Sequence, residues 1–552
     1  MTWPSRQARP APRVIRRPLV ECVRGSVAGS TVVKAFVAKH APSIQGVLAC
    51  FDRLIIRGHL PMASVGYFAT WLRSKNVTLR TKDIPQGWTQ YKQFVPQLAE
   101  QLKEHAKALA ARAGRPFQHL STHQRMELTA RELAQKDNVT DGLVCVYSTM
   151  ETCRTFRVRF NAKGPDLGPD LRVCLVLYYY YMDREFGLIH IKIQTWAPFT
   201  VQVYLNGHEW LAKKLDAAQI GYEKVDNAFV RLDDLAATQK LAGKFATRDW
   251  PALLNCFARR VNPLLSGLLS GQSYYWVIDQ AEFSTDVLFT DRNALERLRP
   301  HLYEHAALCF GAPEVMTFLG RKYRPTFQGE VRTRWHRREP GAAVKHWMKR
   351  NALKMYDKDG RVLRIETVIN DPREFKVHRT RQKQHGGTEV GWFAMSKGIA
   401  NLYRYAQVGR AANTRYLEAL AVVDDLGVGQ KQLDQLCGSV AYQGRKRRAV
   451  QPLSRDDQAL FGAVLRGEYA VRGFKNGELA RVLYGEPPKS ALERRRRCAR
   501  VGRQISLLRA HALVAKIPRS RRYRVTELGQ RFMSTAIALR QKLFPQQLSR
   551  TA

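Results

Sequence analysis

The spacing of apolar residues changes near residue 143. Before that point, stretches such as 88–112 place apolar residues at helical spacing and contain no glycine. After it, short runs rich in Val, Ile, Tyr and Phe, such as 171–181 and 188–196, are separated by Gly and Pro. Strands mixed with helices predict an α+β core. We expect it to span residues 143–395 and to be the candidate catalytic or nucleic-acid-processing domain.

The rest of the chain divides around this core. Its 552 residues are enough for about three to five folding units. We expect a basic N-terminal arm at 1–44 and a mainly helical region at 45–142. A helical segment with a basic linker follows the core at 396–445, and a C-terminal domain occupies 446–552. The predicted fold class is therefore α+β, with a helical N-terminal region and a mixed α/β-sheet core.

The charge of the chain is strongly positive. It contains 91 Lys and Arg against 47 Asp and Glu, a net charge of +44. This excess excludes an average metabolic enzyme with a neutral surface and favours a polyanionic partner, most commonly nucleic acid.

Membrane insertion and disulfide bonding are not expected. No run of about 18 apolar residues occurs, so we predict no membrane-spanning helix. The nine cysteines are spread singly without a CxxC pair, which is typical of reduced thiols in a cytoplasmic protein.

The C-terminal segment has the clearest pattern. Residues 441–552 contain 26 Lys and Arg against 7 Asp and Glu. Three predicted helices are followed by two short strands at 515–519 and 522–526. This order is that of a winged helix-turn-helix, and the string LRAHALVAKIPRSRRYRVTELG (508–529) resembles MarR-type DNA-binding modules.

Arginines gather where such a module would contact DNA. The candidate recognition helix carries Arg494, Arg497, Arg500 and Arg503, and the wing carries Arg519, Arg521, Arg522 and Arg524. Arginine reads guanine with two hydrogen bonds and also contacts phosphates. We interpret these eight residues as nucleic-acid contacts; the alternative is a solvated basic helix without function.

Three acidic residues of the core are candidate metal ligands. Glu366 lies inside the apolar run VLRIETVI, where a carboxylate is costly unless it is paired or binds a cation. With Asp279 and Glu282 it forms our expected site for Mg²⁺ or Mn²⁺. The alternative is that Glu366 pairs with Arg364 or Lys354 in a structural network. No GxxxxGK[ST] loop occurs, so no nucleotide cofactor is expected.

The string KMYDKDGRVLRIE (354–366) is similar to one in rolling-circle replication initiators. The resemblance implies catalytic roles for Tyr356, Lys358 and Glu366, with the tyrosine as nucleophile near the lysine. In place of a His–hydrophobe–His motif, this chain has His190-Ile191-Lys192. The alternative for Tyr356 is packing at a hairpin.

A basic stretch with aromatic residues precedes these strands. Residues 321–350 hold ten Lys and Arg and two acids. Cations can neutralise phosphates while aromatic rings stack on bases. We expect nucleic-acid contacts from Arg321, Lys322, Arg334, Trp335 and Lys345; the alternative is a solubilising loop.

The chain as a whole resembles a bacterial family of similar length that ends in a MarR-like winged helix and has no assigned activity. FDRLIIRGHLP, YYYYMDREFGLIHIKIQTWAPFTVQVYLNGHEWLA and WVIDQAEFSTDVLF are among the strings that carry the resemblance. It implies a shared fold and transfers no catalytic residue.

These observations favour a DNA-binding protein of the mobile-element type, with metal-dependent strand cleavage or transfer in the core. Two alternatives stay open, a non-enzymatic MarR-like regulator and an RNA-binding protein, because phosphate attraction alone does not separate the two polymers. DNA is the preferred partner, no membrane partner is expected, and a homodimer stays open.

Overall fold

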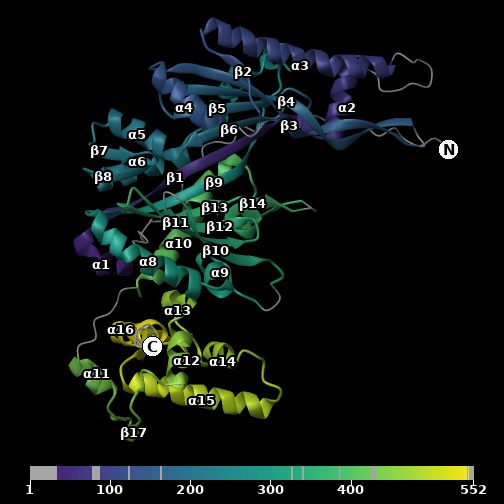
Figure 1. Ribbon diagram of the computed structural model, residues 1–552. Helices are drawn as coiled ribbons and strands as arrows, with labels where there is room; N and C mark the ends of the chain where they lie inside the picture. Colours follow the sequence, from purple (N-terminus) through teal and green to yellow (C-terminus); the bar gives the residue numbers. More distant parts are fainter. Residues whose placement is uncertain are drawn as a thin grey trace, which may run out of the picture. The chain divides into compact units, whose positions relative to one another are not determined.

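The computed structural model describes residues 34–77, 87–121, 125–161, 164–324, 327–338, 341–383, 386–423, 430–543 and 545. Helices and a large mixed sheet make the chain an α+β protein, as predicted (Figure 1). Most of the expected basic arm, residues 1–33, lies outside the described residues, and its last part forms helix α1 (Lys34–Lys39). None of the described helices combines the length and the apolar character needed to cross a bilayer.

Eleven strands of the described chain form one sheet. Its neighbours pair antiparallel, except that β2 and β3 are parallel. The strands follow the order β10 (Val331–Arg338), β11 (Gly341–Met348), β12 (Asn351–Lys358), β13 (Val362–Ile369), β9 (Tyr275–Phe289), β1 (Ile44–His59), β6 (Val201–Asn206), β5 (Gly187–Gln194), β4 (Gly164–Asp183), β3 (Gly142–Asn161) and β2 (Phe117–His119).

Strand β1 corrects the prediction for residues 45–142. This region was expected to be mainly helical, but its first part is a central strand between β9 and β6. The run VLACFDRLII is apolar on both sides of the strand, and a buried apolar run of that kind cannot be told from a helix by periodicity. The remainder contains the helices α2 (Val65–Ser74), α3 (Gly87–Arg112) and α4 (Met126–Lys136).

Two hairpins connect neighbouring strands of the sheet. The MDREFG segment turns β4 into β5, and β12 turns into β13 at Asp359 and Gly360. These two turn residues have φ angles of 55° and 65°, the left-handed conformation, and the Arg361 amide closes the turn by donating to the Lys358 carbonyl at 3.2 Å. The second hairpin places Tyr356 and Glu366 on neighbouring strands.

Different elements cover the two faces of the sheet centre. Helices α5 (Gly207–Ala217) and α6 (Leu235–Gly243) contact β1, and β8 (Ala228–Leu232), which pairs with β7 (Tyr222–Val225), contacts β9 and β13. His208 of α5 contacts Asp286, whereas Asn413 of α10 (Leu402–Leu420) contacts Thr285. Since adjacent residues of a strand point to opposite faces, α5 and α10 lie on opposite sides. We call the side of α5 the acidic face, because Asp286 and Glu366 lie on it.

Further elements complete the described chain. They are α7 (Trp250–Val261), α8 (Arg292–Cys309), α9 (Ala312–Phe318), α11 (Gln430–Leu436), the two-stranded sheets β14 (Lys376–Gln382) with β15 (Thr388–Ala394) and β16 (Val440–Tyr442) with β17 (Arg445–Arg447), the 3₁₀ helices η1 (Ala41–Ser43), η2 (Pro61–Ala63), η3 (Lys244–Thr247), η4 (Pro263–Ser266), η5 (Pro372–Glu374) and η6 (Ile399–Asn401), and the π-helix η7 (Leu539–Leu543).

The C-terminal segment has its own apolar core, which includes Phe461, Leu479, Leu508 and Phe532. Its elements follow in the order α12 (Arg455–Val464), α13 (Gly467–Arg472), α14 (Asn476–Tyr484), α15 (Ala491–Ala510), the hairpin β18 (Val514–Lys516) with β19 (Tyr523–Val525), and α16 (Glu527–Ala538).

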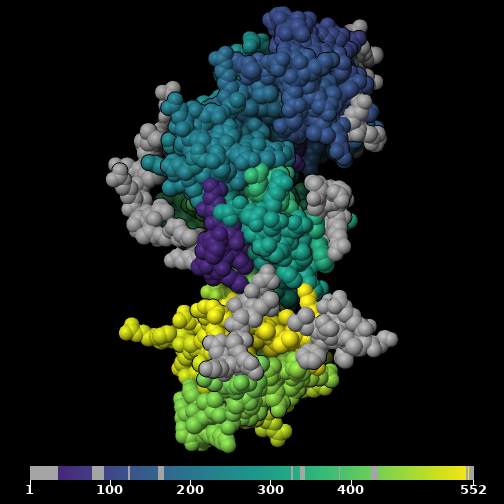
Figure 2. Space-filling model, turned by 60° about the vertical axis from the view of Figure 1, so that its left-hand side comes forward, coloured from purple at the N-terminus to yellow at the C-terminus, as the bar shows by residue number. Residues whose placement is uncertain are grey.

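Long-range pairing joins the beginning of the described chain to its middle. Figure 2 shows purple atoms near the start of the described chain beside teal atoms from much later in the sequence. Strand β1 itself pairs with β9 over most of its length. The candidate site lies on these strands, so it is assembled from distant segments.

Candidate functional site

Three buried carboxylates converge on the acidic face. Asp52 of β1, Glu282 of β9 and Glu366 of β13 each offer one oxygen, and these oxygens lie within 4.8 Å of one another. The residues are 6%, 5% and 1% exposed. Three carboxylate oxygens are a donor set that suits Mg²⁺ or Mn²⁺. We call these residues the carboxylate triad.

A β-bulge brings Asp52 into the triad. The pairing of β1 with β9 shifts register between Phe51 and Leu54, so Asp52 lies on the bulged part of the strand. A bulge adds a residue and re-aims the side chains beside it. Sequence analysis missed Asp52; its only signal was a charge in an otherwise apolar run.

Asp279 does not join the triad, contrary to the expected set of Asp279, Glu282 and Glu366. Its Oδ2 accepts a hydrogen bond from Arg57 Nε at 2.6 Å. A second register shift of β1 against β9 lies between Ile55 and Ile56, beside Asp279. Three residues of a strand span about 10 Å, so Asp279 lies too far along β9 from Glu282 to share its site.

Lys354 lies directly against the triad. Its Nζ donates to Glu366 Oε1 at 2.5 Å and to Glu282 Oε1 at 3.2 Å. Arg53 Nε lies 3.9 Å from Glu282 Oε2. The side chains of Lys354 and Arg53 are 23% and 46% exposed, so these two cations lie between the buried triad and solvent. The pairing of Glu366 with Lys354, the structural alternative from the sequence, is therefore present.

Burial and crowding of negative charge change the titration of Glu366. Burial, together with the carboxylates of Glu282 and Asp52, raises its pKa from 4.5 to about 7, although Lys354 acts in the opposite direction. A carboxyl group with this pKa exchanges a proton near neutral pH. A divalent cation would favour its ionised form.

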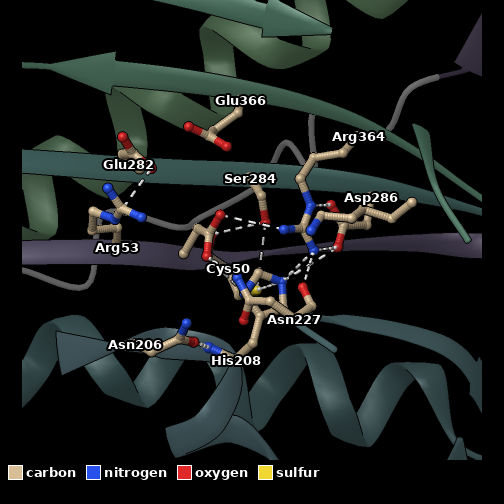
Figure 3. A network of polar contacts seen from close by, with 12 residues as sticks. Cys50, Arg53, Asn206, His208, Asn227, Glu282, Ser284, Asp286, Arg364 and Glu366 are labelled. Atoms are coloured by element: carbon tan, nitrogen blue, oxygen red, sulfur yellow. Dashed lines mark hydrogen bonds and ion pairs between the residues drawn. The ribbon is translucent and has the colours of Figure 1, made fainter. Parts of the chain in front are cut away.

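A second network adjoins the triad and surrounds Arg364, which is fully buried. Its guanidinium donates to Asp286 at 2.7 Å and lies 3.3 Å from Asp52 Oδ2. His208 also belongs to the network. Its Nε2 lies 3.3 Å from Asp286 Oδ2 and 3.5 Å from Cys50 Sγ (Figure 3). Arg364 thus supplies one buried cation to two buried carboxylates, those of Asp52 and Asp286.

The acidic neighbours of His208 change its titration. Burial disfavours its charge, but Cys50 and the hydrogen bonds to Asp286 and Asp52 outweigh burial and raise the pKa of His208 well above its usual value. Sequence analysis did not identify His208 or the role of Asp286, because neither lies in a recognisable motif.

Tyr356 and Lys358 are not arranged as an activated nucleophile. The Tyr356 hydroxyl donates to Glu366 Oε2 at 2.5 Å. Burial and the Glu366 carboxylate raise the pKa of Tyr356 well above its usual value, which disfavours the phenolate. Lys358 Nζ instead donates to Asp226 at 3.2 Å. Of the three expected catalytic residues, the structure therefore brings only Tyr356 and Glu366 together.

A row of cations leads to the triad along the acidic face. The strand register places Arg334, Lys345, Lys354 and Glu366 directly opposite one another across β10, β11, β12 and β13. Directly opposed residues share a face of the sheet. Burial and Lys354 lower the pKa of Lys345, even though Glu282 and Glu366 act against this. We call Arg334, Lys345 and Lys354 the cation row.

The other expected residues of segment 321–350 lie elsewhere. Trp335 alternates with Arg334 along β10 and so points to the opposite face. The ring on the face of the cation row is that of Trp347, which has Arg332 at 4.8 Å and Lys345 at 4.5 Å from its centroid. Arg321 donates to the Glu374 carbonyl at 3.1 Å, and Lys322 is exposed.

Most of the expected arginines of the C-terminal segment are exposed. On α15 these are Arg494, Arg500 and Arg503; in and beside the β18–β19 hairpin they are Arg519, Arg521 and Arg524. Ser490 caps α15 by accepting from the Glu493 amide at 3.1 Å. Exposed guanidinium groups on the first turns of a capped helix can contact a polyanion without breaking internal contacts.

Arg497 and Arg522 differ from the others because they make structural contacts. Arg497 donates to Glu493 at 2.5 Å and to the Glu486 carbonyl at 2.6 Å. Arg522 donates to Glu478 at 3.0 Å and to the Gly473 carbonyl at 2.8 Å. Their expected role as nucleic-acid contacts would require these internal contacts to be given up.

No family model, curated protein or solved structure matches this chain.

Proposed function

We propose that this protein binds DNA and cleaves or transfers a strand at the carboxylate triad with the help of Mg²⁺ or Mn²⁺. The observation that carries the proposal is the convergence of Asp52, Glu282 and Glu366 beside the cation row. A cluster of acidic residues alone does not identify a function. An acidic centre next to a line of Lys and Arg fits a substrate that is itself a polyanion.

The residues of the triad fit the ion that this chemistry needs. Asp52, Glu282 and Glu366 would hold it through oxygen atoms. A bound divalent ion would supply charge stabilisation and an activated water for phosphodiester cleavage. Lys354 and Arg53, at the exposed side of the triad, would bind and orient a phosphate. The Tyr356 hydroxyl holds one oxygen of Glu366 in place.

The C-terminal segment supports recognition of a duplex. We infer that its helices and the β18–β19 hairpin form a winged helix-turn-helix, with α15 as the recognition helix. Such a helix enters the major groove with its N-terminal residues near the base edges. Arg494 and Arg500, both exposed in the first half of α15, are the residues best placed to read bases.

The experiment that tests the proposal is cleavage of supercoiled DNA with Mg²⁺ or Mn²⁺. The wild-type protein is expected to nick the DNA in a chelator-sensitive reaction, and Asp52→Asn and Glu366→Gln are expected to lose this activity. Asp279→Asn is the matched control, because this acid lies on the same strand as Glu282 but outside the triad. Full activity of Glu366→Gln would exclude the triad as the catalytic centre.

A non-enzymatic DNA-binding regulator is the second candidate. It is favoured by Lys354, whose ammonium group already neutralises Glu282 and Glu366. For this function, the wild-type protein would bind duplex DNA but show no cleavage and no heat of Mg²⁺ binding by calorimetry. A calorimetric Mg²⁺ signal that disappears in Asp52→Asn would favour the metal site instead.

A further inference from the structure

The β14–β15 hairpin forms a separate two-stranded sheet, which we call the ribbon. Only Val377 among the described ribbon residues is buried, and Val390 and Trp392 are 67% and 55% exposed. An isolated two-stranded hairpin is only marginally stable in water. A ribbon that leaves both faces open over seven paired positions therefore has surface available for a partner.

The base of the ribbon is attached firmly. The Met395 amide donates to the Phe375 carbonyl at 2.9 Å, and Arg404 Nε donates to the Lys376 carbonyl at 2.8 Å. Val377 and Met395 are buried there. Figure 1 shows β14 extending from this base. The anchored base therefore holds the rest of the β14–β15 hairpin in a defined direction.

The two faces of the ribbon carry different side chains. On one face, His378 opposes Trp392 and Thr380 opposes Val390. The Trp392 ring has Arg404 at 5.1 Å from its centroid. This face offers apolar groups and a ring flanked by a cation.

The other face of the ribbon carries guanidinium groups. Arg379 and Arg381 lie 6.0 Å and 4.9 Å from the centroid of the Phe393 ring. Gly391 lies directly opposite Arg379, so the position paired with this arginine carries no side chain. Arg381 pairs with Glu389 at 3.1 Å, the one acid in segment 376–394.

The charge of the ribbon identifies the class of partner. Segment 376–394 contains four Lys and Arg. Lys376, Arg379 and Lys383 make no ion pair with any residue that the structure describes, and all three are exposed. Unpaired cations on a thin, open ribbon complement a polyanion with a groove.

We propose that the ribbon inserts into the major groove of duplex DNA as a contact separate from α15. This groove is wide enough for a two-stranded β-ribbon. The cations would contact the phosphates along the groove, while Val390 and Trp392 would contact bases or sugars. The inference rests on the proposed function, because it adds a second DNA-binding element to that activity.

The test compares Arg379→Ala/Lys383→Ala with the wild-type full chain on a DNA duplex, a single strand and an RNA duplex by fluorescence anisotropy. Lys75→Ala/Lys240→Ala, which removes the same charge at two other exposed positions, is the control. We expect the ribbon variant to bind the DNA duplex about tenfold more weakly, with a salt slope smaller by about two. Binding to an RNA duplex should change little, because its major groove is too narrow.

Three outcomes would overturn the ribbon proposal: unchanged duplex affinity of the ribbon variant, an equal loss in the control variant, or an equal loss for the single strand. The last would show stacking of unpaired bases rather than groove insertion. The proposed function fails separately, if the wild-type chain binds no DNA. Trp392→Ser adds a second variant whose affinity loss should also be confined to the DNA duplex.

Discussion

The titration of Glu366 is the residue property most sensitive to its surroundings. In an unfolded chain this carboxyl group has its ordinary pKa of 4.5, and in the folded protein its pKa is about 7. Between these pH values the folded protein holds more protons than the unfolded chain. The contribution of Glu366 to stability therefore falls as pH rises from about 4.5 to about 7 and is constant above.

We predict that Glu366→Gln weakens this pH dependence. The pKa difference corresponds to on the order of 3 kcal/mol, so the free energy of unfolding should fall by that much more in the wild type than in the variant between about pH 5 and about pH 8. Urea unfolding at both pH values, in chelator, measures this. Mg²⁺ should make the pH dependence of the wild type more like that of the variant, because the ion favours the ionised carboxyl group of Glu366. Parallel pH profiles of the two proteins would contradict the prediction.

Arg364 is predicted to be essential for stability. Arg364→Met leaves Asp52 and Asp286 buried without their shared cation, so the free energy of unfolding should fall by about 3–5 kcal/mol. Arg373→Ala is the control, since this arginine is 74% exposed and its ion pair with Asp371 is worth at most about 1 kcal/mol. Equal urea midpoints for the two variants would refute a stabilising role for Arg364.

At the scale of elements, α15 provides a test that separates contact from support. Arg500 is exposed, whereas Arg497 contacts Glu493 and the Glu486 carbonyl. We predict that Arg500→Ala weakens duplex binding by about 1–3 kcal/mol without changing thermal stability. Arg497→Ala should lower the melting temperature of the C-terminal segment. Anisotropy and calorimetry on the full chain measure the two effects; the reverse pattern would place Arg497 on the DNA.

Elements with a local signal could be predicted from the sequence, and those defined by long-range pairing could not. The β12–β13 hairpin followed from Asp359-Gly360 between two apolar runs, and it placed Glu366 on a buried strand. Strand β1 was missed because both of its faces are apolar. Of the triad, only Glu282 and Glu366 were predicted. Asp52 was missed because a bulge in β1 brings it to the site, and nothing in a sequence marks a bulge in the pairing of distant strands.

At the scale of the whole molecule, the net charge of +44 predicts a steep salt dependence. If six or more Lys and Arg contact phosphates, duplex affinity should fall at least about 10³-fold between about 50 mM and about 200 mM salt. Anisotropy titrations across this range give the slope. A flat profile would mean that the excess of Lys and Arg serves another purpose than binding a phosphate polymer.

The central position of β1 has a consequence for synthesis on the ribosome. Asp52 emerges more than 300 residues before Glu366, and β1 has β9 and β6 as its neighbours. Until those strands have been translated, the backbone of β1 lacks its partners and is open to pairing with other nascent chains. Truncated products that end before β9 should therefore aggregate, and the full chain should not.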